Sequence, residues 1–198
     1  MKPIFALILV SATLFGCASQ YQNPSLNLRP ESDYYSSVEK NTAKKQIYDG
    51  FMNTLDASAT LMTSDLQRLQ VDQNARIYQW NQDQYNNEKS KVESEMTKST
   101  EVFLSFFVPE RKHDDLHKAS TKWKIFLDAA GKRVEGKATK MKILLAEAQT
   151  LYPHHTRWGT PYKLSFPIPT SLTENGNAKV TLTGPVGSTT FEFQKLIP

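Results

Sequence analysis

All four histidines of the 198-residue chain lie in two short segments. His113 and His117 flank a pair of aspartates in the first segment, and His154 and His155 are adjacent in the second. Imidazoles and carboxylates are ligands for zinc or copper, so the four rings would form a metal site if both segments lay at one end of the fold. They would then also respond to pH, because imidazole titrates near neutrality. The alternative is that they are ordinary histidines in polar surface loops.

Aromatic and basic side chains form a second candidate site, suited to interaction. Trp158 and Tyr162 flank a Gly-Thr-Pro segment, and Lys122, Lys124 and Lys163 stand in stretches that alternate with apolar residues. Tyr and Trp are common in recognition patches, and a row of lysines attracts anionic envelope material such as lipopolysaccharide phosphates or cell-wall carboxylates. Alternatively, the aromatic rings close the end of a β core, and the lysines dock an acidic segment of the same chain.

Motifs of known catalytic sites are missing from the sequence. It contains no G-x-S-x-G, no H-E-x-x-H and no glycine-rich phosphate loop. Its one cysteine rules out both an internal disulfide and a zinc site made of paired cysteines. We therefore expect a protein that is not an enzyme and holds no cofactor.

The first sixteen residues have the composition of an export signal. Lys2 is positively charged, and residues 4–14 form an apolar stretch that leads into Leu14-Phe15-Gly16-Cys17. This stretch is shorter than the roughly 20 residues that span a bilayer, but it suits a signal peptide.

The segment from Leu14 to Cys17 resembles the lipobox of bacterial lipoproteins. The resemblance covers only this N-terminal segment, and it implies cleavage before Cys17 with palmitate-type acyl chains on the thiol. Two or three acyl chains give a durable membrane anchor. Ala18, in place of aspartate, implies sorting to the outer membrane, with the folded part facing the periplasm. An ordinary secretory signal with an incidental cysteine is the alternative.

Two N-terminal regions are expected after the signal. Residues 17–37, rich in Ser, Asn, Gln and Pro, predict a flexible tether. Residues 38–99 predict a helical segment, because apolar residues recur at steps of three and four over 44–82. This stripe either packs on its own domain or forms a coiled-coil seam with a second copy. After Trp80 the apolar residues thin out, which predicts a solvated or partly disordered segment.

From residue 100 to 198 the period of the apolar pattern changes to two. Alternating stretches separated by Gly, Pro and Asn turns predict six strands, with a short helix at 140–152. The predicted fold is α+β: a long amphipathic helix or helical hairpin, followed by an antiparallel immunoglobulin-like β-sandwich. The predicted strands cover residues 102–108, 121–128, 133–139, 162–168, 179–182 and 189–195.

The two parts differ in charge, and together they favour one functional class. Residues 31–101 carry 8 Lys and Arg against 12 Asp and Glu, whereas residues 102–198 carry 14 against 8. We expect a lipid-anchored envelope protein that acts as an interaction or assembly module, with a protein partner or self-association through the helix. Nucleic acid is excluded as a partner because export removes the protein from it. The alternative is a periplasmic ligand- or metal-binding lipoprotein, with hydrolytic chemistry at the histidine loops, and a third option is a passive spacer.

Overall fold

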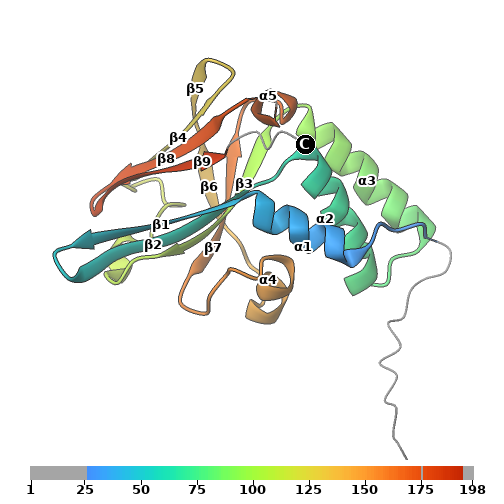
Figure 1. Ribbon diagram of the computed structural model, residues 1–198, viewed down its shortest axis with the longest axis horizontal. Coiled ribbons are helices and arrows are strands. Elements are labelled where there is room, and N and C mark those ends of the chain that lie inside the picture. Colours follow the sequence, from blue (N-terminus) through green and yellow to red (C-terminus); the bar gives the residue numbers. More distant parts are fainter. Residues whose placement is uncertain (1–25, 175, 194–198) are drawn as a thin grey trace, which may run out of the picture.

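The computed structural model describes residues 26–174 and 176–193, which form two antiparallel sheets and five α-helices (Figure 1). The sheets lie at one end of the molecule, and α1, α2 and α3 lie together at the other. This arrangement confirms the mixed α and antiparallel β class that the sequence predicts.

The larger sheet has five strands in the order β1-β2-β3-β7-β6. Strand β2 pairs with β3 from Asp56↔Phe107 to Leu61↔Val102 and with β1 as far as Met52, so its first residues extend beyond β3. The strands span Thr42–Asp49 (β1), Met52–Leu61 (β2), Thr100–Phe107 (β3), Thr160–Phe166 (β7) and Lys137–Lys140 (β6).

The smaller sheet has four strands in the order β5-β4-β8-β9 and shares one hydrophobic core with the larger sheet. The strands span Lys132–Glu135 (β5), Lys124–Ala129 (β4), Ala178–Gly184 (β8) and Gly187–Phe193 (β9). Gly136 joins β5 to β6, so the chain passes there from one sheet to the other. Its N–H donates to Ile125 at 2.9 Å, and a Cβ at this position would lie 2.4 Å from the Phe166 ring, so only glycine fits.

A second core holds the helices against the outer face of β3. Phe103 of β3 stacks on Tyr152 with ring centroids 3.5 Å apart, and buried Tyr34 donates a hydrogen bond to the Leu151 carbonyl at 2.7 Å. Leu66 and Leu69 of α2 complete this helical core. The helices span Glu31–Lys40 (α1), Ser64–Ile77 (α2), Gln82–Met96 (α3), Leu145–Leu151 (α4) and Ser171–Glu174 (α5).

The prediction of one helix over 44–82 is wrong for its first half, which forms the β1–β2 hairpin. Leu55, Ala57, Ala59 and Leu61 are buried in the core between the sheets, so burial follows a period of two. Gly50 takes φ +57° in the turn, a conformation that glycine adopts at little cost. A new helix, α2, begins only after Thr63, whose side chain accepts from the Leu66 N–H.

The predicted boundaries change accordingly. Because β2 pairs with β3, residues 38–99 are not a separate helical segment from 100–198. The tether predicted over 17–37 is also too long, since α1 begins at Glu31, and residues 17–25 lie outside the described part. The coiled-coil seam is wrong as well, because Leu66 and Leu69 are buried in this chain's own helical core. The solvated segment after Trp80 is confirmed as helical: α3 buries Met96 alone.

Candidate functional site

His154 and His155 lie on the outer face of the five-stranded sheet. The Nδ1 atom of His155 is 2.7 Å from the Ser105 hydroxyl, and the Nε2 atom of His154 is 3.3 Å from the Thr60 hydroxyl. Both rings also present an edge to Phe103. They follow α4, whose docking on Phe103 through Tyr152 sets their position.

His113 and His117 lie in the segment after β3 and have different partners. The Nε2 atom of His113 is 3.6 Å from Glu110, and the Nδ1 atom of His117 is 3.3 Å from the Tyr162 hydroxyl. The main-chain carbonyl of His113 accepts from the Trp123 indole at 2.8 Å. These contacts tie the segment to the edge of the core between the sheets.

The two histidine segments meet, as predicted, but the metal site does not form. The Thr160 hydroxyl donates to Asp114 at 2.6 Å, and Arg111 donates to the Trp158 carbonyl at 3.3 Å, so the segments share one end of the fold. Within residues 26–174 and 176–193, however, no group of three or more His, Cys, Asp or Glu side chains could hold a metal ion. The prediction fails because His117 and His155 each face their own partner within the fold.

Burial also removes the pH response expected near neutrality for one of these rings. Burial, with smaller contributions from Lys44 and His155, lowers the pKa of His154 to about 4. Burial likewise lowers the pKa of His155. Around pH 7 His154 is therefore neutral, and the pair acts as a set of hydrogen-bonding groups on the sheet face.

The two aromatic residues of the predicted interaction patch differ in exposure. Trp158 is 58% exposed, whereas Tyr162 is fully buried in the core between the sheets. The Tyr162 hydroxyl donates to the Asp114 carboxylate at 3.0 Å, and burial, followed by this carboxylate, raises the pKa of Tyr162. Trp158 is thus available to a partner, and the prediction for Tyr162 is wrong.

The predicted lysine row is compensated by acidic neighbours. Lys124 pairs with Glu135 at 2.7 Å, and Lys163 pairs with Glu101 at 2.9 Å. Lys122 is exposed just before β4. Exposed pairs of this kind contribute little to stability, but they weaken the field that a row of free lysines would produce.

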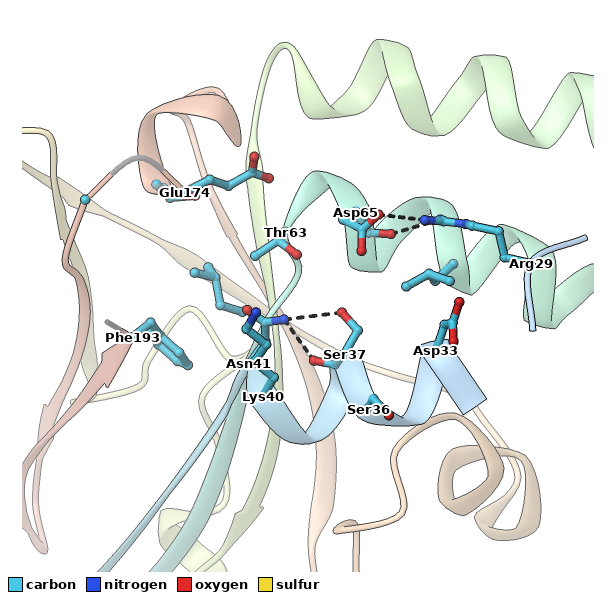
Figure 2. A pocket seen from close by; sticks show the side chains of 14 residues that line it. Arg29, Asp33, Ser36, Ser37, Lys40, Asn41, Thr63, Asp65, Glu174 and Phe193 are labelled. Carbon is cyan, nitrogen blue, oxygen red and sulfur yellow. Dashed lines mark hydrogen bonds and ion pairs between the residues drawn. The ribbon is translucent and has the colours of Figure 1, made fainter. Parts of the chain in front are cut away.

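A cavity of about 550 Å³ lies where α1, the start of α2, α5 and the end of β9 meet (Figure 2). Two pairs of its polar residues bond to one another: Arg29 donates to Asp65 at 2.6 Å, and the Asn41 amide donates to the Ser37 carbonyl at 2.8 Å. Glu174 reaches from α5 and accepts the main-chain N–H of Ser64 at the start of α2. The cavity therefore has the size of a ligand site, and Arg29 and Glu174 at its wall bond to the first residues of α2.

Arg29 also fixes where the described chain enters the fold. Its Nε atom and its main-chain N–H both lie 3.3 Å from the carboxylate of Asp72, which is almost fully buried and also accepts from Tyr85 at 2.7 Å. The chain therefore leaves toward its N-terminus beside α2. Cys17 lies outside the described residues, and no described helix is long and apolar enough to cross a membrane.

The sequence reasoning missed an exposed apolar tip on the β1–β2 hairpin. The Phe51 side chain is fully exposed, Met52 is 72% exposed and Tyr48 is 55% exposed. The Asp49-Gly50 pair is a frequent hairpin turn signal and could have revealed the tip. We refer to Tyr48, Phe51 and Met52 together as the hairpin tip.

The comparisons with known proteins name no family for the chain. No family model and no curated protein matches its sequence. A solved structure described as a novel protein of unknown function from Burkholderia pseudomallei K96243 is similar over 83% of this chain and 90% of that one. The TM-score is 0.40 and the sequence identity is 12%.

Proposed function

We propose that this protein is a lipid-anchored envelope protein that acts as a non-catalytic interaction module and presents its hairpin tip to a protein partner. The observation that carries this proposal is the complete exposure of Phe51 at the end of a paired hairpin. Burying a Phe or Met side chain contributes roughly 1.5–3 kcal/mol. The exposed tip is therefore stabilised only when another molecule covers it.

The hairpin that carries the tip is firmly held. Strand β1 pairs with β2 along its whole length, and the Thr54 hydroxyl donates to the Ile47 carbonyl at 3.2 Å. Leu55, just behind the tip, is fully buried. A preorganised aromatic tip of this kind loses little conformational freedom on binding, which favours affinity.

The position of the hairpin tip on the molecule supports the same proposal. The β1–β2 turn projects at the end away from α1, α2 and α3, and residues 26–30 enter beside those helices (Figure 1). With acyl chains on Cys17 and Ala18 at the next position, we infer attachment to the outer membrane from the helical end, with the hairpin tip directed into the periplasm. For the β part we infer an immunoglobulin-like sandwich, which the core shared by the two sheets supports.

Site-specific photo-crosslinking in intact cells tests the interaction. A photoreactive residue at position 51 should give a discrete protein adduct, which should disappear when Met52→Asp is added. The control is the same residue at Ser90, an exposed position on α3. Adducts of the same pattern from both positions, or none from position 51, would contradict the proposal.

Labelling with palmitate tests the anchor separately. The parent chain should incorporate the label and sediment with membranes, and Cys17→Ser should do neither. A Cys17→Ser chain that is labelled and sediments like the parent would overturn the placement in the envelope.

A further inference from the structure

The C-terminal end of α2 and the start of α4 together expose a second apolar surface. Leu144 is 76% exposed, Leu145 44%, Tyr78 47% and Ile77 37%. The Tyr78 hydroxyl donates a hydrogen bond to the Glu147 carboxylate, which links the end of α2 to α4. We refer to these four apolar residues as the α2–α4 patch.

From this patch we infer a docking surface for an anionic lipid bilayer, a role that rests on the proposed membrane anchor. The patch would lie against the same bilayer that holds the acyl chains of Cys17. It would fix the orientation of the folded part, which a lipidated tether alone leaves free.

Residue types in the patch match the chemistry of a membrane interface. Tyr78 stacks on Trp80 with centroids 6.0 Å apart, and Tyr and Trp are enriched where hydrocarbon meets headgroups. Lys140 and Lys142 are exposed just before Leu144, whereas Met141 and Ile143 between them pack on the helical core. The segment therefore directs two ammonium groups and then two leucines outward. Basic residues beside exposed apolar ones are typical of segments that bind anionic lipid surfaces.

The point of chain entry places the patch within reach of the anchored bilayer. Arg29 bonds to Asp72, and Ile77 follows five residues later, about 8 Å further along the helix. Cys17 precedes Leu26 by nine residues, which span at most about 30 Å when extended. The acyl chains and the patch can therefore reach one bilayer together, and the tether raises the effective concentration of the patch at that surface.

Co-sedimentation with vesicles tests this inference without the anchor. The probe is a chain beginning at residue 18, because both cores lie within the described residues and do not depend on the signal. It should bind vesicles of phosphatidylethanolamine and phosphatidylglycerol, and bind phosphatidylcholine vesicles more weakly. Leu144→Asp should lower the binding about tenfold, and replacing Lys140 and Lys142 together by glutamate should lower it at least as much.

The matched control is Leu172→Asp, the same change at a leucine of α5 that is 40% exposed. It should bind vesicles like the parent, and the unfolding midpoints of all variants should stay near that of the parent. Absence of binding by the parent, or equal binding by Leu144→Asp and Leu172→Asp, would overturn the docking surface. Palmitate labelling would be unaffected by that failure. If the parent chain is not labelled by palmitate but the chain beginning at residue 18 binds vesicles, the anchor is overturned instead.

Discussion

Replacing Gly136 with alanine tests the point where the chain passes between the two sheets. The added Cβ would lie 2.4 Å and 2.6 Å from Cε1 and Cδ1 of Phe166, whose side chain is fully buried. Real Cβ atoms do not approach ring carbons so closely, so the ring or strand β6 has to move. Overpacking of this kind costs about 1–3 kcal/mol, and the loss of glycine freedom in the unfolded chain offsets at most about 1 kcal/mol. We expect a net loss of about 1–2 kcal/mol.

Urea unfolding, followed by far-ultraviolet circular dichroism, measures this loss. Combining Gly136→Ala with Phe166→Leu should recover about 1 kcal/mol relative to the sum of the single changes, because the smaller side chain relieves the clash. Gly176→Ala is the control, since a Cβ there meets no atom within 4 Å. A Gly136→Ala protein as stable as the parent, or strictly additive changes, would refute the close packing of Gly136 on Phe166.

Three further predictions concern the helical core, Arg29 and the dependence of stability on pH. Leu66→Ala should lower the free energy of unfolding by about 2–5 kcal/mol, because Leu66 is fully buried. Sedimentation should show the same oligomeric state as the parent; an oligomer that dissociates when Leu66 is replaced would instead support the coiled-coil seam. Arg29→Ala should cost about 1–3 kcal/mol by removing a partner of buried Asp72; Asp65→Ala, which removes only the exposed partner, should cost less than about 1 kcal/mol in the same urea titration. The pKa of His154 is about 4 in the folded protein, whereas an unperturbed histidine has a pKa of about 6.5. As the pH falls below about 6.5, His154 is protonated in the unfolded chain before it is protonated in the folded protein. The contribution of neutral His154 to stability is therefore fully present above that pH and decreases toward pH 4. Between pH 7.5 and 4.5 His154→Gln should lose up to about 2.5 kcal/mol less stability than the parent, and identical pH dependence in both would contradict the shift.

Strands β4, β7 and β8 could be predicted because one face of each is buried and carries large apolar side chains. In β7, Tyr162, Leu164 and Phe166 are fully buried, and the residues between them are at least partly exposed. In β8, Val180 and Leu182 follow the same rule. When large apolar side chains alternate with polar ones, the pattern indicates a strand rather than a helix.

The β1–β2 hairpin could not be recognised by the same means. The buried face of β2 contains Ala57 and Ala59, and its outer face contains Ser58 and Thr60, which are also buried. Small and buried polar residues give little contrast between the two faces, so the larger residues nearby suggested a helical spacing. Pairing with β3, more than forty residues away, decides the conformation.

In the candidate site, too, some features could be predicted from the local sequence and others depend on packing between distant segments. That the histidine segments meet follows from their places in the chain, and Thr160 and Asp114 do join them. The direction of each ring depends on packing that leaves no local signal, such as Tyr152 on Phe103 beside His155. The burial of Tyr162, by contrast, could have been inferred, because this residue alternates with Leu164 and Phe166 in the predicted strand.

The fold separates the two surfaces that we propose for contact. The hairpin tip belongs to the sheets, where β2 extends past the end of β3, and the α2–α4 patch belongs to the helical layer that Arg29 ties to the start of the described chain. The helical layer is joined to the sheets through Phe103 and Tyr152, which stack inside the helical core. Because both surfaces are built on elements packed into cores, the orientation of one determines that of the other. Docking the α2–α4 patch on a bilayer would therefore also fix the direction in which the hairpin tip points, and the two proposals are linked through the geometry of a single chain.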